Sequence, residues 1–193
     1  MKMKRTRDIR VIRTQTALLE ALEELIKTKK LSNITITELC SAAKINRNTF
    51  YYHYNNIFEF LDEHKQIILE DLNEISEISK THNKQNLVEV FTVLKKHPHF
   101  LNILISPNCD LDFFNEIFEI ATSKSSIIFS KDSSNLSNKE RLLCSYCNAG
   151  CNAVIITWIM NGMKETPEEI ADFIWTSSKQ GVFSLLFPEE KFE

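Results

Sequence analysis

Apolar positions along this chain recur at the spacing of α-helices. In the first third, one apolar stripe has its members three and four positions apart, which predicts an amphipathic helix over residues 8–29. Its members are Leu18, Ala21, Leu22, Leu25 and Ile26. A second stripe begins just after residues 55–56 and predicts a longer helix; it consists of Ile57, Leu61, Ile68, Leu72 and Ile75.

Two short helices are predicted between these longer ones. Thr35 with Glu38 three residues later has the spacing of a capping box, so a helix should begin there and run to Ala43. Lys44 and Ile45 form a tight turn, and Asn46 can cap a further helix that ends near Tyr54. Later helices are expected over 86–96, 99–105, 111–130, 139–163 and 167–186, with prolines at several boundaries.

The whole pattern predicts an all-α protein of 193 residues in two domains. Two short helices joined by a tight turn, with a longer helix before them, suggest a helix-turn-helix domain over residues 1–56. Residues 57–193 would form a helical domain for dimerisation and effector binding. Residues 1–54 carry eleven Lys and Arg against five Asp and Glu, whereas the rest of the chain is acidic. This asymmetry suits a polyanion-binding module, although a basic solvated tail would give the same count.

The short helix after Asn46 is unusually rich in aromatic residues. Phe50 and Tyr54, four residues apart, mark its buried side, so Asn48 and Tyr52 should point away from the core. Thr49 and Tyr51 should lie on its flanks. Outward tyrosines and amides suit a nucleic-acid surface, where they can bind phosphates and base edges. The alternative is that Tyr51 and Tyr52 pack on a neighbouring helix.

A family resemblance rests on the segment ITITELCSAAKINRNTFYYHY, residues 34–54. It resembles the helix-turn-helix of the TetR/AcrR family of bacterial transcriptional regulators, and the similarity extends over roughly residues 9–70. The segment YCNAGCNAVIITWIMNGMKETPEEIA, residues 146–171, is similar to a subgroup that includes regulators of dihydroxyacetone kinase operons. The resemblance implies DNA contacts from two helices, made by Thr35, Thr37, Asn46, Arg47, Asn48, Thr49, Tyr51, Tyr52 and His53.

The chain departs from the family pattern at two positions. Lys44 stands in the turn where the family often has glycine, so a residue with a side chain must take up the backbone conformation of the turn. Ile57 stands where the family often has a lysine that grips a phosphate. One backbone contact to DNA in each subunit is therefore expected to be missing.

The last two predicted helices are apolar on more than one side. Such helices need two burial partners, which are either another chain or more of the same chain. The resemblance implies a four-helix interface between two subunits. Candidate interface residues are Cys147, Cys151, Trp158, Ala171, Trp175, Ser178 and Val182.

Other chemistry is weakly supported. Cys144, Cys147 and Cys151 share a helical face that could ligate a soft metal, but they lie in an apolar stripe, so we expect no metal and no cofactor. Several phenylalanines could line an effector pocket or form the core, and no ligand-binding residue is assigned. The chain lacks the phosphate-loop, zinc-hydrolase and serine-hydrolase motifs, which argues against an enzyme.

The expected protein is a cytoplasmic, dimeric, DNA-binding transcriptional regulator. It should bind a palindromic operator in double-stranded DNA and act as a repressor that a small-molecule effector relieves. The alternative is an activator or co-regulator that uses the same DNA-binding surface with a protein partner. No membrane role is expected, because the longest apolar run, residues 153–160, is too short to cross a bilayer. Five cysteines without a disulfide scaffold suit a reducing compartment.

Overall fold

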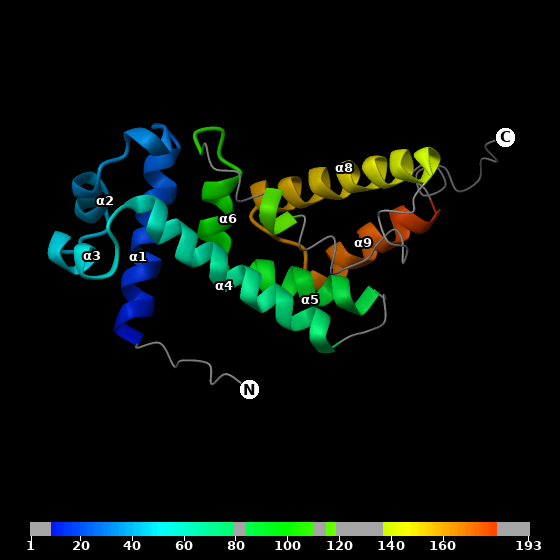
Figure 1. Ribbon diagram of the computed structural model, residues 1–193, viewed down its shortest axis with the longest axis horizontal. Helices are drawn as coiled ribbons and strands as arrows, with labels where there is room; N and C mark the ends of the chain where they lie inside the picture. Colours follow the sequence, from blue (N-terminus) through cyan, green and yellow to red (C-terminus); the bar gives the residue numbers. More distant parts are fainter. Residues whose placement is uncertain (1–8, 79–83, 110–114, 119–136, 181–193) are drawn as a thin grey trace. The chain divides into compact units, whose positions relative to one another are not determined.

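The computed structural model of the protein describes residues 9–78, 84–109, 115–118 and 137–180. Those residues contain helices and no strand (Figure 1), so the all-α fold class is confirmed. They divide into two compact units, Met1–Gln66 with His99–Asp112 and Ile67–Pro98 with Phe113–Glu193. The division therefore falls inside α4 (Ile57–Ile78), later than the boundary expected at residue 56. Most of the helix predicted over 111–130 lies outside the described residues.

The first unit is built around α1 (Ile9–Ile26), followed by a short 3-10 helix, η1 (Leu31–Asn33). Two seven-residue helices come next, α2 (Ile36–Ala42) and α3 (Arg47–His53), and then the first part of α4 (Figure 1). The predicted apolar stripes face inward, as the helical period requires. The most deeply buried side chains of this unit include Leu18, Leu22, Leu39, Phe50, Phe60 and Leu61.

The first turn of α2 has the predicted capping box. The Glu38 amide donates to the Thr35 hydroxyl oxygen at 3.2 Å, and the Thr35 amide donates to the Glu38 carboxylate at 3.0 Å. Two amides that the helix itself leaves without partners are therefore satisfied by each other's side chains. Lys29 also forms an ion pair with Glu38 and joins the end of α1 to the start of α2.

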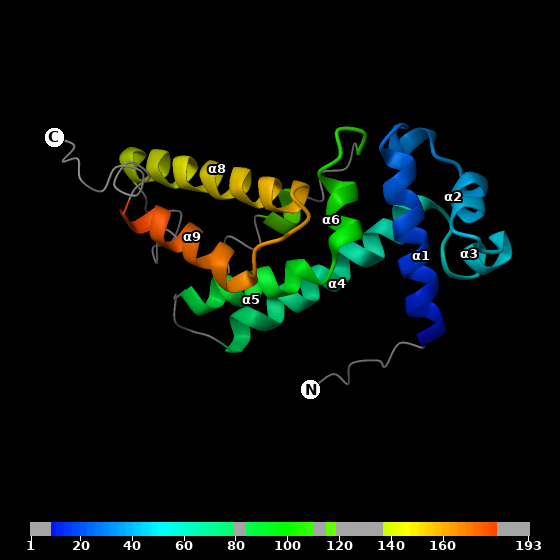
Figure 2. The same cartoon turned by 180° about the vertical axis from the view of Figure 1, so that it is seen from behind.

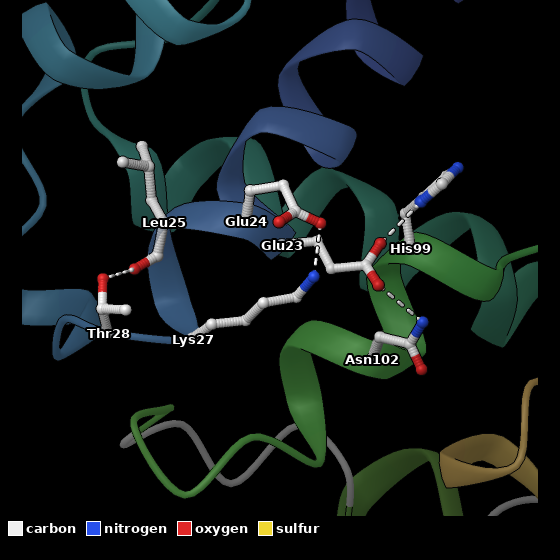
Figure 3. Close-up of polar contacts among 7 residues, drawn as sticks. All are labelled: Glu23, Glu24, Leu25, Lys27, Thr28, His99 and Asn102. Carbon is white, nitrogen blue, oxygen red and sulfur yellow. Dashed lines mark hydrogen bonds and ion pairs between the residues drawn. The ribbon is translucent and has the colours of Figure 1, made fainter.

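A short helix from further along the chain, α6 (Pro98–Leu104), is bound to α1 within this unit. Glu23 lies between two α6 side chains (Figure 3): its Oε2 is 2.6 Å from Nδ1 of His99, and its Oε1 accepts a hydrogen bond from the Asn102 amide at 2.8 Å. Farther on, the Asn108 side chain donates to the Ile26 carbonyl at 2.8 Å. Residues 99–109 thus belong to the first unit although α5 precedes them in sequence.

The second unit contains α5 (Lys84–Lys95), α8 (Asn138–Met160) and α9 (Pro167–Gln180). α5 packs along α9 (Figure 2), and the Lys95 ammonium donates to the Glu165 carbonyl, just before α9, at 2.8 Å. The Trp158 ring of α8 meets the edge of the Phe91 ring of α5, with centroids 5.3 Å apart. These contacts join α5 to both of the later helices.

α8 has more apolar surface than the described residues of its own unit cover. By length and composition alone, Arg141–Met160 is long enough and apolar enough to cross a membrane. The uninterrupted apolar run over residues 153–160, on which the expectation from the sequence rested, is too short to do so. A core helix of a soluble protein passes the same test, but such a helix is mostly buried, and only 24% of this window is buried within the chain. The exposed apolar surface of α8 is therefore suited to a further partner.

The capping box should make the stability of the first unit depend on pH. The Lys29 hydrogen bond, together with the Thr35 amide and hydroxyl, lowers the pKa of Glu38 from 4.5 to about 2. A lowered pKa means that the stabilisation is complete above pH 4.5 and is lost as the pH falls toward 2. Because glutamine can still serve in a capping box, Glu38→Gln should remove this pH dependence and keep the cap. When thermal unfolding midpoints are measured from pH 6 to pH 2, those of Glu38→Gln should therefore fall less steeply than those of the wild type.

The control for this prediction is Lys29→Met, which removes the main cause of the shift while leaving the carboxylate in place. It should flatten the same part of the curve, and added salt should reduce the difference because the pair is exposed. Parallel curves for the wild type and Glu38→Gln would contradict the assignment.

Candidate nucleic-acid interface

The turn between α2 and α3 is a Schellman motif. The Ile45 amide donates to the Cys40 carbonyl at 2.9 Å, and the Lys44 amide donates to the Ser41 carbonyl at 3.2 Å. The motif requires a left-handed residue after the C-cap, and Lys44 occupies that position with a φ of 56°. The family's usual glycine is thus replaced by a lysine with the same backbone conformation, at some cost in strain.

α3 is fixed at both of its ends. At its start, the Asn46 side chain accepts a hydrogen bond from the Asn48 amide at 2.8 Å, as the sequence predicted for an N-cap. At its end, the Tyr54 amide donates to the Phe50 carbonyl at 2.9 Å. The Phe50 and Tyr54 rings are buried and in contact, with centroids 5.5 Å apart, and both also contact the Phe60 ring of α4.

The outer face of α3 exposes the residues expected there. Tyr52 is 83% exposed and Tyr51 is 49% exposed, whereas Phe50 is only 1% exposed. The other expected contact residues on this helix and its cap are also exposed: Asn46, Arg47, Asn48, Thr49 and His53. Tyr52 therefore has most of its surface open to solvent, and Tyr51 about half, so folding of the first unit does not use the whole of either ring.

Neighbouring side chains on α3 hold some of these groups in place. The Arg47 guanidinium lies 5.9 Å from the centre of the Tyr51 ring, within the range of a cation–π contact. The Tyr52 and His53 rings meet edge to face with centroids 4.8 Å apart. Such contacts reduce the freedom that a side chain must lose on binding, and so favour a preformed surface.

The two threonines predicted to contact DNA from α2 have different roles in the structure. The Thr35 hydroxyl is already engaged in the capping box, since it donates to the Glu38 carboxylate at 2.8 Å and accepts from the Glu38 amide. Thr37 lies in the first turn of α2 and is exposed. Of the two hydroxyls, the one of Thr37 is therefore better placed to bind a phosphate.

The start of α4 differs from a phosphate-binding helix end. Ile57 is only 5% exposed, so its side chain belongs to the core of the unit. The first turn is capped by its own residues: the Glu59 carboxylate accepts from the Asn55 amide at 2.8 Å, and the Asn56 side chain accepts from the Glu59 amide at 2.8 Å. A carboxylate thus occupies the position near the helix N-terminus where an anion would otherwise be stabilised.

The residues predicted for a subunit interface do not share one surface. Three of them, Cys151, Trp158 and Ala171, are at most 5% exposed within a single chain, so they have almost no area left for a partner. Cys147, Trp175 and Ser178 are partly exposed, and Val182 lies outside the described residues. The reason is that these buried residues lie where the helices of this unit meet: α9 packs against both α5 and α8, and Trp158 of α8 contacts Phe91 of α5.

The sequence analysis missed the apolar residues that are exposed on the same two helices. They are Leu142, Leu143, Tyr146, Met160 and Phe173, which are between 47% and 73% exposed. A groove between α8 and α9 is lined by Tyr146, Val154 and Phe173 among others. The signal in the sequence was the apolar character of α8 on more than one side, which indicates a second covering surface but not which face it meets, nor whether another chain or more of the same chain provides it.

Cys151 on the cysteine face and two of the phenylalanines behave as packing residues. Burial raises the pKa of the Cys151 thiol, which disfavours the thiolate that a metal would need. Across the described residues, no three His, Cys, Asp or Glu side chains converge in a way that could hold a metal ion. Phe91 and Phe100 are buried in the cores of their units, and Phe113, Phe114 and Phe129 lie outside the described residues.

Residues 81–180 match the TetR_C_8 family model, described as a transcriptional regulator C-terminal region, which covers just over half of the chain. The chain belongs to the TetR family of transcriptional regulators. The family consists of transcriptional regulators and not of enzymes, so the expectation that the protein is not an enzyme is confirmed. Members of the family bind DNA through a helix-turn-helix of the kind described above.

Individual proteins are similar to this chain to different extents. An uncharacterised HTH-type transcriptional regulator of Bacillus subtilis (strain 168), YxbF, is 23% identical in an alignment of 181 residues that covers 87% of this chain but only 45% of that protein. The chain therefore spans less than half the length of this relative. The solved structure of the dihydroxyacetone kinase operon activator DhaS is 21% identical, with a TM-score of 0.53 over 88% of this chain and 96% of that one, and it shares the fold. A TetR regulator from Rhodococcus sp. RHA1 aligns with 13% identity over 91% of this chain and 99% of that chain, at a TM-score of 0.36.

The left-handed turn residue of this TetR-family protein should limit its stability. Replacing Lys44 by Gly should raise the free energy of unfolding by roughly 0.5–1 kcal/mol, because glycine adopts a positive φ without the clash of a Cβ atom. Lys44→Ala is the matched control: it removes the same charge but keeps the Cβ atom, and should give no such gain. Urea unfolding of the three proteins measures the difference, and equal stabilisation by Ala and Gly would contradict the strain.

Proposed function

We propose that the protein binds a near-palindromic operator in double-stranded DNA as a homodimer and represses transcription until a small-molecule effector releases it. The observation that carries the DNA-binding part is the outer face of α3. Tyr52, Tyr51 and the flanking amides are exposed there although the opposite side of the helix is packed by Phe50 and Tyr54. A surface this rich in aromatic and amide groups suits contacts with phosphates, sugars and base edges. Such a role places the protein in the cytoplasm, where the DNA is.

The proposed dimer rests on the exposed apolar surface of α8 and α9. Tyr146 is 72% exposed and Phe173 is 55% exposed, and both line the groove between the two helices. A second copy of the chain could cover this surface with its own α8 and α9 in a two-fold arrangement, so that the same residues meet on both sides. This face replaces the more deeply buried set of residues predicted from the sequence.

The direction of regulation has a second candidate. DhaS, which shares this fold, is named as an operon activator. An activator would use the same face of α3 on DNA and contact a protein partner elsewhere. Transcription in vitro from a promoter that contains the operator separates the two: a repressor lowers transcript yield on addition of the protein, and an activator raises it.

The operator can be found without knowing the regulated genes. The purified full-length chain should enrich duplexes from a random-sequence pool, and the enriched sequences should be near-palindromes. In a dimer with two recognition helices, the half-site centres should lie about one helical turn, roughly 34–36 Å, apart. Enriched sequences without two-fold symmetry would contradict the dimeric mode, and no enrichment at all would contradict sequence-specific binding.

Base-reading residues should be distinguishable from phosphate-binding residues on α3. Asn48→Ala or Tyr52→Ala should weaken operator binding by about 1–3 kcal/mol and reduce discrimination, because both residues lie opposite the buried side of the helix. Tyr51→Phe removes only a hydroxyl on the flank, and should weaken operator and scrambled duplexes alike. Competition assays with both duplexes give the ratio. An unchanged operator-to-scrambled ratio for Asn48→Ala would show that the reading face is assigned wrongly.

The dimer face can be tested independently of DNA. Tyr146→Asp combined with Phe173→Asp should give monomers in sedimentation velocity, because four carboxylates would be buried between two apolar surfaces. The matched control is Ile12→Asp, an exposed apolar residue of α1 in the other unit, which should leave the dimer intact. Circular dichroism should show helical content unchanged in both variants. A wild-type monomer at micromolar concentration would disprove the dimer.

A further inference from the structure

A buried glutamine interrupts the apolar stripe of α1. Gln15 is only 6% exposed and lies on the same side of the helix as Leu18, Leu19 and Leu22, where an apolar residue would serve the core better. A buried polar side chain costs free energy unless it is hydrogen-bonded, so its partners show what it does.

Both partners of Gln15 come from other helices. Its side-chain nitrogen donates to the Tyr54 hydroxyl oxygen at 2.7 Å, and the same nitrogen lies 3.4 Å from the Glu63 carboxylate of α4. Tyr54 is the C-cap residue of α3, and its ring packs between Phe50 and Phe60. One buried side chain of α1 therefore meets the end of the recognition helix and the next helix at a single point.

We infer that Gln15 is a positioning residue for DNA recognition: through Tyr54 it fixes the angle at which α3 presents its outer face. This inference rests on the proposed DNA-binding function of that face. α3 has seven residues, of which only Phe50 is buried, and the Tyr54 ring packs just after its end. Ring packing is non-directional, so it leaves a short helix some freedom to tilt. The hydrogen bond at Tyr54 has a defined length and direction, and it therefore fixes the end of α3 more closely than packing does.

The geometry matters more for base contacts than for phosphate contacts. A hydrogen bond to a base edge needs donor and acceptor in line within narrow limits, whereas the attraction between a cation and a phosphate falls off slowly with distance. Loss of the Gln15 link should therefore lower discrimination among sequences before it lowers general affinity for DNA.

The test uses a pair of substitutions that separates positioning from stability. Gln15→Met keeps the length of the side chain without its polar end, and Tyr54→Phe removes only the hydroxyl. Either change alone leaves a buried polar group with fewer partners. The double variant removes both members of the Gln15–Tyr54 hydrogen bond together and leaves only Glu63, which is half-buried and long at 3.4 Å, so it should unfold at nearly the wild-type urea concentration. Leu22→Met is the matched control, because it is an apolar exchange at a fully buried α1 position without a polar link to α3.

The expected result is that the double variant remains stable yet loses discrimination. Its operator-to-scrambled affinity ratio, measured on the duplex selected from the random pool, should fall about tenfold, which is the scale of one good base contact. The ratio for Leu22→Met should stay within about twofold of the wild type. If Gln15 serves stability only, the stable double variant will recover the wild-type ratio, and that outcome overturns the inference.

A measurement without DNA separates this inference from the proposed function. Hydrogen exchange in the free protein should show faster exchange of α3 amides, Arg47–His53, in both Gln15→Met and the double variant, with α2 unchanged. If the wild type selects no duplex, the proposed function fails and the exchange data alone decide the inference. Unchanged α3 exchange in both variants then overturns it.

Discussion

The anchoring of α3 by two buried rings is the constraint on which the rest of the first unit depends. A helix of seven residues is far too short to be stable in water alone, because its nucleation cost exceeds the gain from so few hydrogen bonds. Phe50, which is 1% exposed, and Tyr54, which is 5% exposed, supply the missing stability by packing on Phe60. Since these two rings point inward, the helical period turns Asn48 and Tyr52 outward. The functional face of the helix is thus a consequence of what the core requires.

The other parts of the first unit keep this helix in place from several directions. The Schellman turn at Lys44 sets the direction in which the chain leaves α2, and the caps at Asn46 and Tyr54 define where α3 begins and ends. Gln15 joins α1 to the far end of α3 by a buried hydrogen bond. Each device is worth little free energy by itself, but together they leave a short helix with one orientation.

The link between the two units runs through α4 and through the junction of α5 with α6. The structure assigns residues after His99 to the first unit, where Glu23 binds both His99 and Asn102 (Figure 3). Among the described residues, the chain passes from one unit to the other inside α4 and again at the start of α6. The Glu23 carboxylate, 19% exposed, holds the start of α6 to α1 within the first unit.

Local patterns in the sequence were sufficient to predict the helices, their caps and the outward face of α3. The Thr35–Glu38 spacing, the Asn46 cap and the inward period of Phe50 and Tyr54 depend on residues within one or two turns of each other, so local stereochemistry decides them. What depends on distant residues was decided by the tertiary structure. The sequence did not show that Cys151, Trp158 and Ala171 face their own unit, or that α6 binds α1. Gln15 precedes the apolar stripe that begins at Leu18 and was assigned no role from the sequence, and only packing brings it to Tyr54, 39 residues away in sequence. The physical reason is that helical periodicity defines faces, whereas the choice of neighbour for each face is made by the packing of the whole chain.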